Sequence, residues 1–312
     1  EGLVNSQVVG NQIVPAIAGL AGGGYVVSWQ DNSSLPGDGS GSSIKAQRYD
    51  ASGTRVGTEF FVNSTTLFNQ ATPAVTALSN GGFVVSWGDE SGTLGDSSGA
   101  SIKAQVYDAG GTPIGTEFLV NTQTSGSQQE TTIAALANGG FVVSWRDDSG
   151  TLGDASESSI KAQIYNAFGV RVGGEFLVNT QTSNGQFNPA ITGLAGGGFV
   201  VSWDDDSGTL GDGSLSSIKA QIYDASGVRV GSEFLVNTET GGFQLYPTIT
   251  ALAGGGFVVG WQDGELLAIG SGTLGDASGG SIKAQIYDAS GARVGSEFLV
   301  NTQVLNGQFD PA

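Results

Sequence analysis

The sequence predicts an all-β protein, a five-bladed β-propeller of four-stranded blades built on a 58-residue repeat. Three observations predict it. Glycine supplies 53 of 312 residues while charged residues make up only 13%, which suits short strands joined by glycine turns. Each copy contains four short apolar segments between turn signals. Five tryptophans lie 58 residues apart, each closing the phrase Gly-Gly-(Phe/Tyr)-Val-Val-(Ser/Gly)-Trp: Trp29, Trp87, Trp145, Trp203 and Trp261.

The fourth copy shows the four expected strands in order. Residues 189–194 run through a glycine turn into 199–203, which is a hairpin signal. After a polar loop, 218–224 and 233–237 form a second hairpin with a wider, glycine-bearing connection. The consecutive apolar residues of Phe-Val-Val fit a strand buried on both faces, as the middle strands of radially packed sheets are. A period near that of kelch repeats, about 50, favours a propeller over a solenoid.

We expect one repeat domain over 1–312, because each repeat packs only on its neighbours and the usual size limit of a single core does not apply. The blades would span about 13–64, 71–122, 129–180, 187–238 and 245–302. Residues 1–7 repeat the strand at 297–303 and would be an extra terminal strand. That strand closes the ring or pairs with another chain, or else the chain is a slice of a longer array.

Composition excludes several classes of function. A net charge of −18 repels nucleic acids and anionic membranes. The sequence contains no run of about 18 apolar residues, the length that a membrane-spanning helix needs. Cys, His and Met are all absent, which excludes thiol and imidazole catalysis and metal sites built on nitrogen or sulfur. A cysteine-free, acidic, glycine-rich chain fits an extracellular or cell-surface bacterial protein.

An acidic loop follows each tryptophan, and two aspartates recur in all five copies. Carboxylates with Ser and carbonyl oxygens on a short glycine loop suit calcium, so we predict a calcium site in each loop. The alternative is that Asp, Ser and Gly only build soluble turns, with the copy's lysine pairing with its aspartates at the surface. The ten candidate metal ligands are Asp31, Asp38, Asp89, Asp96, Asp147, Asp154, Asp205, Asp212, Asp263 and Asp276.

Paired carboxylates also raise the possibility of glycoside hydrolysis. An acid and a base must differ in environment, whereas this pair occurs five times over, so repetition argues for structure or multivalent binding. An enzyme would need one cleft unlike the other four, and the insertion at 264–270 in the fifth loop is the candidate. The tryptophans could stack on sugars, but a Trp that ends a Phe-Val-Val strand fits blade packing better.

The phrases Gly-Gly-Phe-Val-Val-Ser-Trp, Ile-Lys-Ala-Gln-Ile-Tyr-Asp-Ala-Ser-Gly and Gly-Ser-Glu-Phe-Leu-Val-Asn-Thr resemble tandem repeats of large secreted bacterial surface proteins, including RTX-type calcium-binding exoproteins and adhesins. The resemblance covers nearly the whole chain and implies a propeller-like module, an extracellular location and calcium. It supplies no activity. The tandem RTX nonapeptide does not occur here, and the loops depart from integrin-type Asp-x-Asp-x-Asp-Gly loops by carrying Ser and Gly at the middle ligand positions.

From these observations we expect a non-catalytic extracellular module, structural or adhesive, in a bacterial surface layer, filament or large adhesin. Its partners would be other copies of itself, other surface proteins or glycans, with no nucleic acid. The alternative is a multivalent carbohydrate-binding lectin, which would show five similar clefts with an exposed aromatic residue in each.

Overall fold

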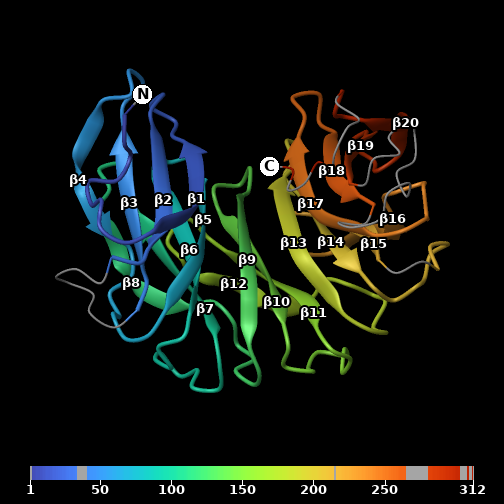
Figure 1. Cartoon of the computed structure of the whole chain (residues 1–312), viewed down its shortest axis with the longest axis horizontal. Helices are drawn as coiled ribbons and strands as arrows, with labels where there is room; N and C mark the ends of the chain where they lie inside the picture. The colour runs from blue at the N-terminus through green and yellow to red at the C-terminus, as the bar shows by residue number, and fades with distance from the viewer. Residues whose placement is uncertain are drawn as a thin grey trace. The chain divides into compact units, whose positions relative to one another are not determined.

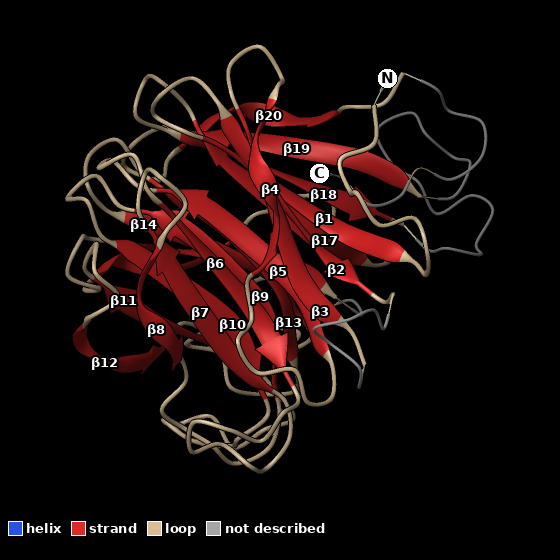
Figure 2. Cartoon of the chain, turned by 90° about the vertical axis from the view of Figure 1, so that its left-hand side faces the viewer, coloured by secondary structure: helices blue, strands red, loops and turns tan. Residues whose placement is uncertain are grey.

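The computed structural model describes residues 2–33, 41–213, 216–264, 280–302, 308 and 311. Throughout these residues the chain forms strands and loops (Figure 2). The described residues contain no helix that could cross a membrane. The inserted loop, 264–270, lies outside the described residues apart from Gly264, and so do Asp38 and Asp276.

Twenty strands form five four-stranded sheets, each following the order of the chain (Figure 1). We call each sheet a blade. Blade 1 contains β1 (Gln12–Gly19), β2 (Tyr25–Asp31), β3 (Ser43–Tyr49) and β4 (Arg55–Phe61). Blade 2 contains β5 (Gln70–Ala77), β6 (Phe83–Asp89), β7 (Ser101–Tyr107) and β8 (Pro113–Leu119). Blade 3 contains β9 (Gln128–Ala135), β10 (Phe141–Asp147), β11 (Ser159–Tyr165) and β12 (Arg171–Leu177).

The remaining two blades repeat this pattern. Blade 4 contains β13 (Gln186–Gly193), β14 (Phe199–Asp205), β15 (Ser217–Tyr223) and β16 (Arg229–Leu235). Blade 5 contains β17 (Gln244–Ala251), β18 (Phe257–Asp263), β19 (Ser281–Tyr287) and β20 (Arg293–Leu299). Each first strand begins one residue before the expected blade boundary. The expected division into one domain stays a prediction.

Glycine makes the turn between the first two strands of a blade possible. In blade 4, a Cβ atom on Gly198 would lie 2.1 Å from the carbonyl oxygen of Tyr223. Gly197 has φ +101°, a conformation that other residues rarely adopt. The double glycine before each Phe-Val-Val is therefore needed for the first hairpin and for its close approach to the third strand.

The two middle strands form the core of each blade, and in blades 1, 2, 4 and 5 they pair residue by residue without a register shift. In blade 4, Phe199 lies opposite Tyr223, and their rings stack 5.0 Å apart. Trp203 is fully buried, as are three of the other four tryptophans, and Trp29 is only 3% exposed. The tryptophans are packing residues, as the position after Phe-Val-Val predicted, because indole rings bury large apolar areas.

The chain divides into two compact units. The first contains residues 1–149 and 162–176, which include blades 1 and 2 and most of blade 3. The second contains 150–161 and 177–312, which include blades 4 and 5. In each unit, successive blades share a hydrophobic core: Val84 and Ile102 of blade 2 cluster with Phe141 and Trp145 of blade 3. Burial of this apolar area is the main force that joins one blade to the next.

Candidate functional site

The first aspartate of each predicted pair ends the second strand of its blade and is buried. These residues are Asp31, Asp89, Asp147, Asp205 and Asp263. In four copies the lysine on the third strand contacts this aspartate, and the Nζ–Oδ distances are 3.1 Å (Lys45–Asp31), 2.9 Å (Lys103–Asp89), 2.6 Å (Lys219–Asp205) and 2.8 Å (Lys283–Asp263). The expected lysine pairing exists, but it is buried rather than at the surface.

A glutamate on the fourth strand completes this cluster, which we call the triad. Glu117 lies 3.4 Å from Nζ of Lys103 and also accepts a hydrogen bond from the backbone N–H of Ser64. Burial is the largest influence on the Glu117 carboxyl and raises its pKa, but the Ser64 hydrogen bonds and the charge of Lys103 together hold the pKa below its usual value. In blade 5, burial dominates and raises the pKa of Asp263.

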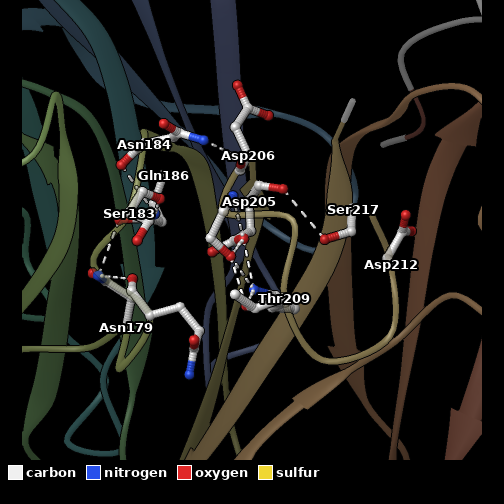
Figure 3. Close-up of polar contacts among 12 residues, drawn as sticks. Asn179, Ser183, Asn184, Gln186, Asp205, Asp206, Thr209, Asp212 and Ser217 are labelled. Atoms are coloured by element: carbon white, nitrogen blue, oxygen red, sulfur yellow. Dashed lines mark hydrogen bonds and ion pairs between the residues drawn. The ribbon is translucent and has the colours of Figure 1, made fainter. Parts of the chain in front are cut away.

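The second aspartate of each pair has different partners. Asp96, Asp154 and Asp212 each accept a 2.8 Å hydrogen bond from an asparagine two residues beyond the fourth strand, namely Asn121, Asn179 and Asn237. In Figure 3, Asp212 stands apart from the group around Asp205 and Thr209. Among the residues that the structure describes, no group of three or more Asp and Glu side chains gathers into a metal-binding cluster. Calcium binding by these loops stays a prediction.

A different pair of positions varies from blade to blade. It consists of the third residue of the first strand of each blade, which we call the inner strand, and the residue after the tryptophan. We call these two residues the bulge pair. A register shift in the first hairpin of each blade falls at the inner-strand member. The five bulge pairs are Val14 and Gln30, Thr72 and Gly88, Glu130 and Arg146, Asn188 and Asp204, and Tyr246 and Gln262.

The inner-strand member of the bulge pair has a strained backbone in every blade. Its φ is 50° at Val14, 49° at Thr72, 55° at Glu130, 49° at Asn188 and 53° at Tyr246. Non-glycine residues rarely adopt positive φ, and for a β-branched residue it is a true outlier. Backbone strain of this kind persists where the surrounding structure imposes it, and it concentrates at functional sites. The bulge pairs are therefore the candidate functional positions of the fold.

Blade 3 places a charged bulge pair beside a cavity in the first unit. Nη1 of Arg146 lies 3.4 Å from Oε1 of Glu130, and Nε of Arg146 lies 3.1 Å from Asp148. Glu130 and Glu90 both line a cavity of about 210 Å³, together with Asn69, Thr72 and Gln129. Asn69 donates a 2.8 Å hydrogen bond to Glu90. Two carboxylates thus line one small cavity, and one of them is paired with a guanidinium.

Blade 4 places carboxylates at the same positions in the second unit. Asn188 donates a 2.6 Å hydrogen bond to Asp204, which is only 1% exposed. Two residues further on, Asp206 is half-buried. Burial is the largest influence on its carboxyl and raises the pKa; a hydrogen bond from Ser216 lowers the pKa, and the charges of Asp205 and Glu157 raise it further. A raised pKa favours the protonated form of this carboxyl.

Sequence reasoning missed the bulge pairs because it searched for residues that recur. The position on the first strand carries five different residue types and the position after the tryptophan carries four, so a search for repeated motifs passes over them. An alignment of the five copies with one another would have found them, since each inner-strand member follows an invariant glutamine by two residues: Gln12, Gln70, Gln128, Gln186 and Gln244. The signal was the difference between copies.

No protein-family model matches the sequence. No curated protein matches it either. Among solved structures, the chain is similar to a Dyadobacter fermentans protein of unknown function, with 11% identity, 95% of this chain and 85% of that chain covered and a TM-score of 0.56. It is also similar to Penicillium chrysogenum α-L-arabinanase complexed with arabinobiose (15% identity, 96% and 83% covered, TM-score 0.54). A third match is a thermostable family-43 glycoside hydrolase (10% identity, 98% of both chains covered, TM-score 0.50).

At these identities the matches show the fold. The predicted class, all-β with five four-stranded propeller blades on a 58-residue repeat, is confirmed. The resemblance to RTX-type exoproteins and adhesins gains no support from the comparisons.

The expectation of a non-catalytic structural or adhesive module is wrong. It rested on the argument that five identical units cannot supply one asymmetric site. Over nearly its whole length the chain has the fold of an α-L-arabinanase and of a family-43 glycoside hydrolase, so this architecture accommodates catalysis. The bulge pairs also show where the symmetry breaks, because each blade carries different side chains there while its core is repeated. The fold matches to these two glycoside hydrolases also contradict the expectation that the chain is not an enzyme.

Proposed function

We propose that this protein hydrolyses glycosidic bonds in a glycan, with Glu90 as its acid and Glu130 as its base or nucleophile. The observation that carries the proposal is the cavity in the first unit that both carboxylates line. Hydrolysis of a glycosidic bond needs two carboxyl groups on either side of the bond, one to protonate the leaving oxygen and one to activate water or attack the sugar. Solved structures with this fold include an arabinanase with bound arabinobiose, which supports a glycan as substrate.

The surroundings of the two acids support different roles. Arg146 stabilises a negative charge on Glu130, which suits the base or nucleophile. Glu90 lines the cavity and is exposed, which suits a side chain that protonates the oxygen of a departing sugar. The cavity is smaller than the roughly 300–1,000 Å³ of typical ligand pockets, so it suits one sugar ring with the rest of the glycan outside.

The backbone at Glu130 has the positive φ that all five blades share at this position, with a strain on the order of 1–3 kcal/mol. The strain therefore belongs to the repeat, and what distinguishes blade 3 is that this position carries a carboxylate that lines a cavity. An extracellular location, which remains a prediction, would bring such an enzyme into contact with polysaccharides.

The test is release of reducing sugar from a panel of polysaccharides, beginning with arabinan because of the arabinanase fold match. We expect Glu130→Gln and Glu90→Gln each to lower kcat by about 10²–10⁴-fold with folding unchanged. Glu239→Gln is the matched control, since four other copies of its motif carry Gln there (Gln7, Gln123, Gln181 and Gln303). Absence of hydrolysis across the panel, or hydrolysis that survives both substitutions, would overturn the proposal.

A further inference from the structure

The residue after the tryptophan carries a side chain in four blades and none in blade 2. In blade 2 it is Gly88, on β6. Gly88 lines the same cavity as Glu90 and Glu130. The residues at this position in blades 1, 3, 4 and 5 are Gln30, Arg146, Asp204 and Gln262.

In blades 1 and 3 this side chain occupies the space beside the residue that stands three positions after the tryptophan. Nε2 of Gln30 donates a 3.1 Å hydrogen bond to Oδ1 of Asn32. Nε of Arg146 lies 3.1 Å from Oδ1 of Asp148. The equivalent residue in blade 2 is Glu90, and blade 2 has no side chain to contact it in this way. The cavity of about 210 Å³ lies there instead.

The backbone of blade 2 does not require glycine at this position. Gly88 has no positive φ, so other residues can adopt its conformation. A Cβ atom on Gly88 would lie 3.6 Å from Oγ1 of Thr72 and 3.7 Å from the carbonyl oxygen of Ala71, which are ordinary contacts. Glycine inside a strand often marks a place where a ligand approaches the backbone closely. The distinctive consequence of glycine here is therefore the open space above it.

Two polar side chains around this space have hydrogen-bonding capacity left. Oε2 of Glu90 accepts a 2.8 Å hydrogen bond from Asn69, and among the described residues the carboxylate has no other partner. Thr72 lines the cavity too, and its hydroxyl has no hydrogen-bond partner in the part of the chain that the structure describes. A hydroxyl both donates and accepts, as the hydroxyl groups of a sugar do. Small-molecule sites combine such a space with a few placed polar groups.

We infer that the sugar ring next to the cleaved bond binds over Gly88, with a ring hydroxyl bonded to Thr72 and the leaving oxygen toward Glu90. The inference rests on the proposed function, because it takes the glycan substrate as the occupant of the cavity. Gly88 is then a specificity-determining residue: its missing side chain gives the sugar ring its room. It also explains why the site lies at blade 2, since the other blades fill this position with a side chain.

Steady-state kinetics on the hydrolysed polysaccharide tests the role of Gly88. One methylene more or less in a binding pocket changes kcat/KM by about 10–200-fold. We expect Gly88→Ala to raise KM about tenfold with kcat less affected, because it removes room for the bound ring. Gly88→Gln introduces the residue of blades 1 and 5 and should abolish hydrolysis. Thermal melting should show that both variants fold, since a Cβ atom at this position makes only ordinary contacts.

Gly174→Ser is the matched control. Gly174 lies on β12, a Cβ atom there would meet nothing within 4 Å, and it does not line the cavity. Its KM and kcat should equal those of the wild type. The other four blades already carry a side chain at this position: Thr58, Thr116, Ser232 and Ser296.

Saturation-transfer NMR with L-arabinose, D-xylose, D-galactose and D-glucose measures sugar binding apart from hydrolysis. We expect a signal from at least one sugar with the wild type and with Gly174→Ser, and its loss in Gly88→Gln. That result without hydrolysis of any polysaccharide would support the sugar site and overturn the proposed function. Hydrolysis or sugar signals that are unchanged in Gly88→Gln would overturn the sugar site. Absence of both binding and hydrolysis in the wild type would overturn both.

Discussion

The triads and the bulge pairs lie at the same end of each second strand, but the triad residues are repeated in every blade whereas the bulge-pair residues vary. A triad consists of the same Lys, Asp and Glu in each copy, with the lysine buried. A bulge pair begins at the neighbouring position on the same strand and differs in all five blades. The repeated group solves a packing problem that all blades share. The varied group is free of that demand, so it is where an activity can differ from blade to blade.

The largest expected effect comes from breaking a triad. Lys103→Met removes the positive charge between two buried carboxylates, which should lower the free energy of unfolding by about 3–5 kcal/mol. Urea denaturation measures it. The control combines Lys103→Met with Asp89→Asn and Glu117→Gln, which leaves no buried charge and should recover most of the loss. A single-variant loss below about 1 kcal/mol would show that the triads contribute little to blade stability.

The second prediction concerns Glu130, where activity and stability should change in opposite directions. Glu130→Asn should abolish hydrolysis and raise the free energy of unfolding by up to about 1 kcal/mol, because asparagine tolerates a positive φ and the half-exposed ion pair with Arg146 is weak. Val14→Asn relieves the same strain where no acid is present, so it should raise stability and keep activity. Loss of stability in both variants would contradict strain at the bulge.

The third prediction concerns how the triads of blades 2 and 5 make the free energy of unfolding depend on pH. The folded pKa of Glu117 lies below its unfolded value near 4.5, so its stabilising contribution is fully present above about pH 4.5 and is lost as the pH falls through the folded pKa. Glu117→Gln should therefore make the fall in unfolding free energy below pH 4.5 shallower than in the wild type. The pKa of Asp263 is raised on folding, so its effect has the opposite sign. Its contribution to the free energy of unfolding is present at low pH and is lost as the pH rises through the folded pKa. An unchanged acid slope in Glu117→Gln would show that the carboxyl is not stabilised by folding.

The smallest expected effect concerns calcium. If the acidic loops bind it, calcium should raise Tm by a few degrees and a chelator should reverse the change, because a ligand that binds the folded state stabilises it by mass action. We expect a small effect because Lys219 already contacts Asp205, and Asn237 already contacts Asp212. Asp212→Asn should reduce any calcium response. A Tm that is the same with calcium and with chelator would leave the loops as turns.

The sequence predicted the fold well and the candidate site poorly, for one physical reason. Blade packing imposes the same residues at the same spacing, so Trp203 and its four equivalents revealed the strand pattern and the core. The bulge is different: a residue such as Glu130 enters a positive φ because of register shifts in the hairpin, and nothing in its own propensity signals this. The burial of the Asp–Lys pairs was also missed, since it depends on packing between strands rather than on the composition of the loop.

The even burial of the tryptophans has a practical consequence for spectroscopy. Five indoles in nearly the same apolar surroundings should emit at nearly the same short wavelength, so a fluorescence melting curve averages over all five blades and conceals which blade opens first. Replacing four of them with phenylalanine would leave a single reporter, for example Trp145 in blade 3 or Trp261 in blade 5. A set of five such chains would record, blade by blade, whether unfolding spreads from one end or begins in the middle.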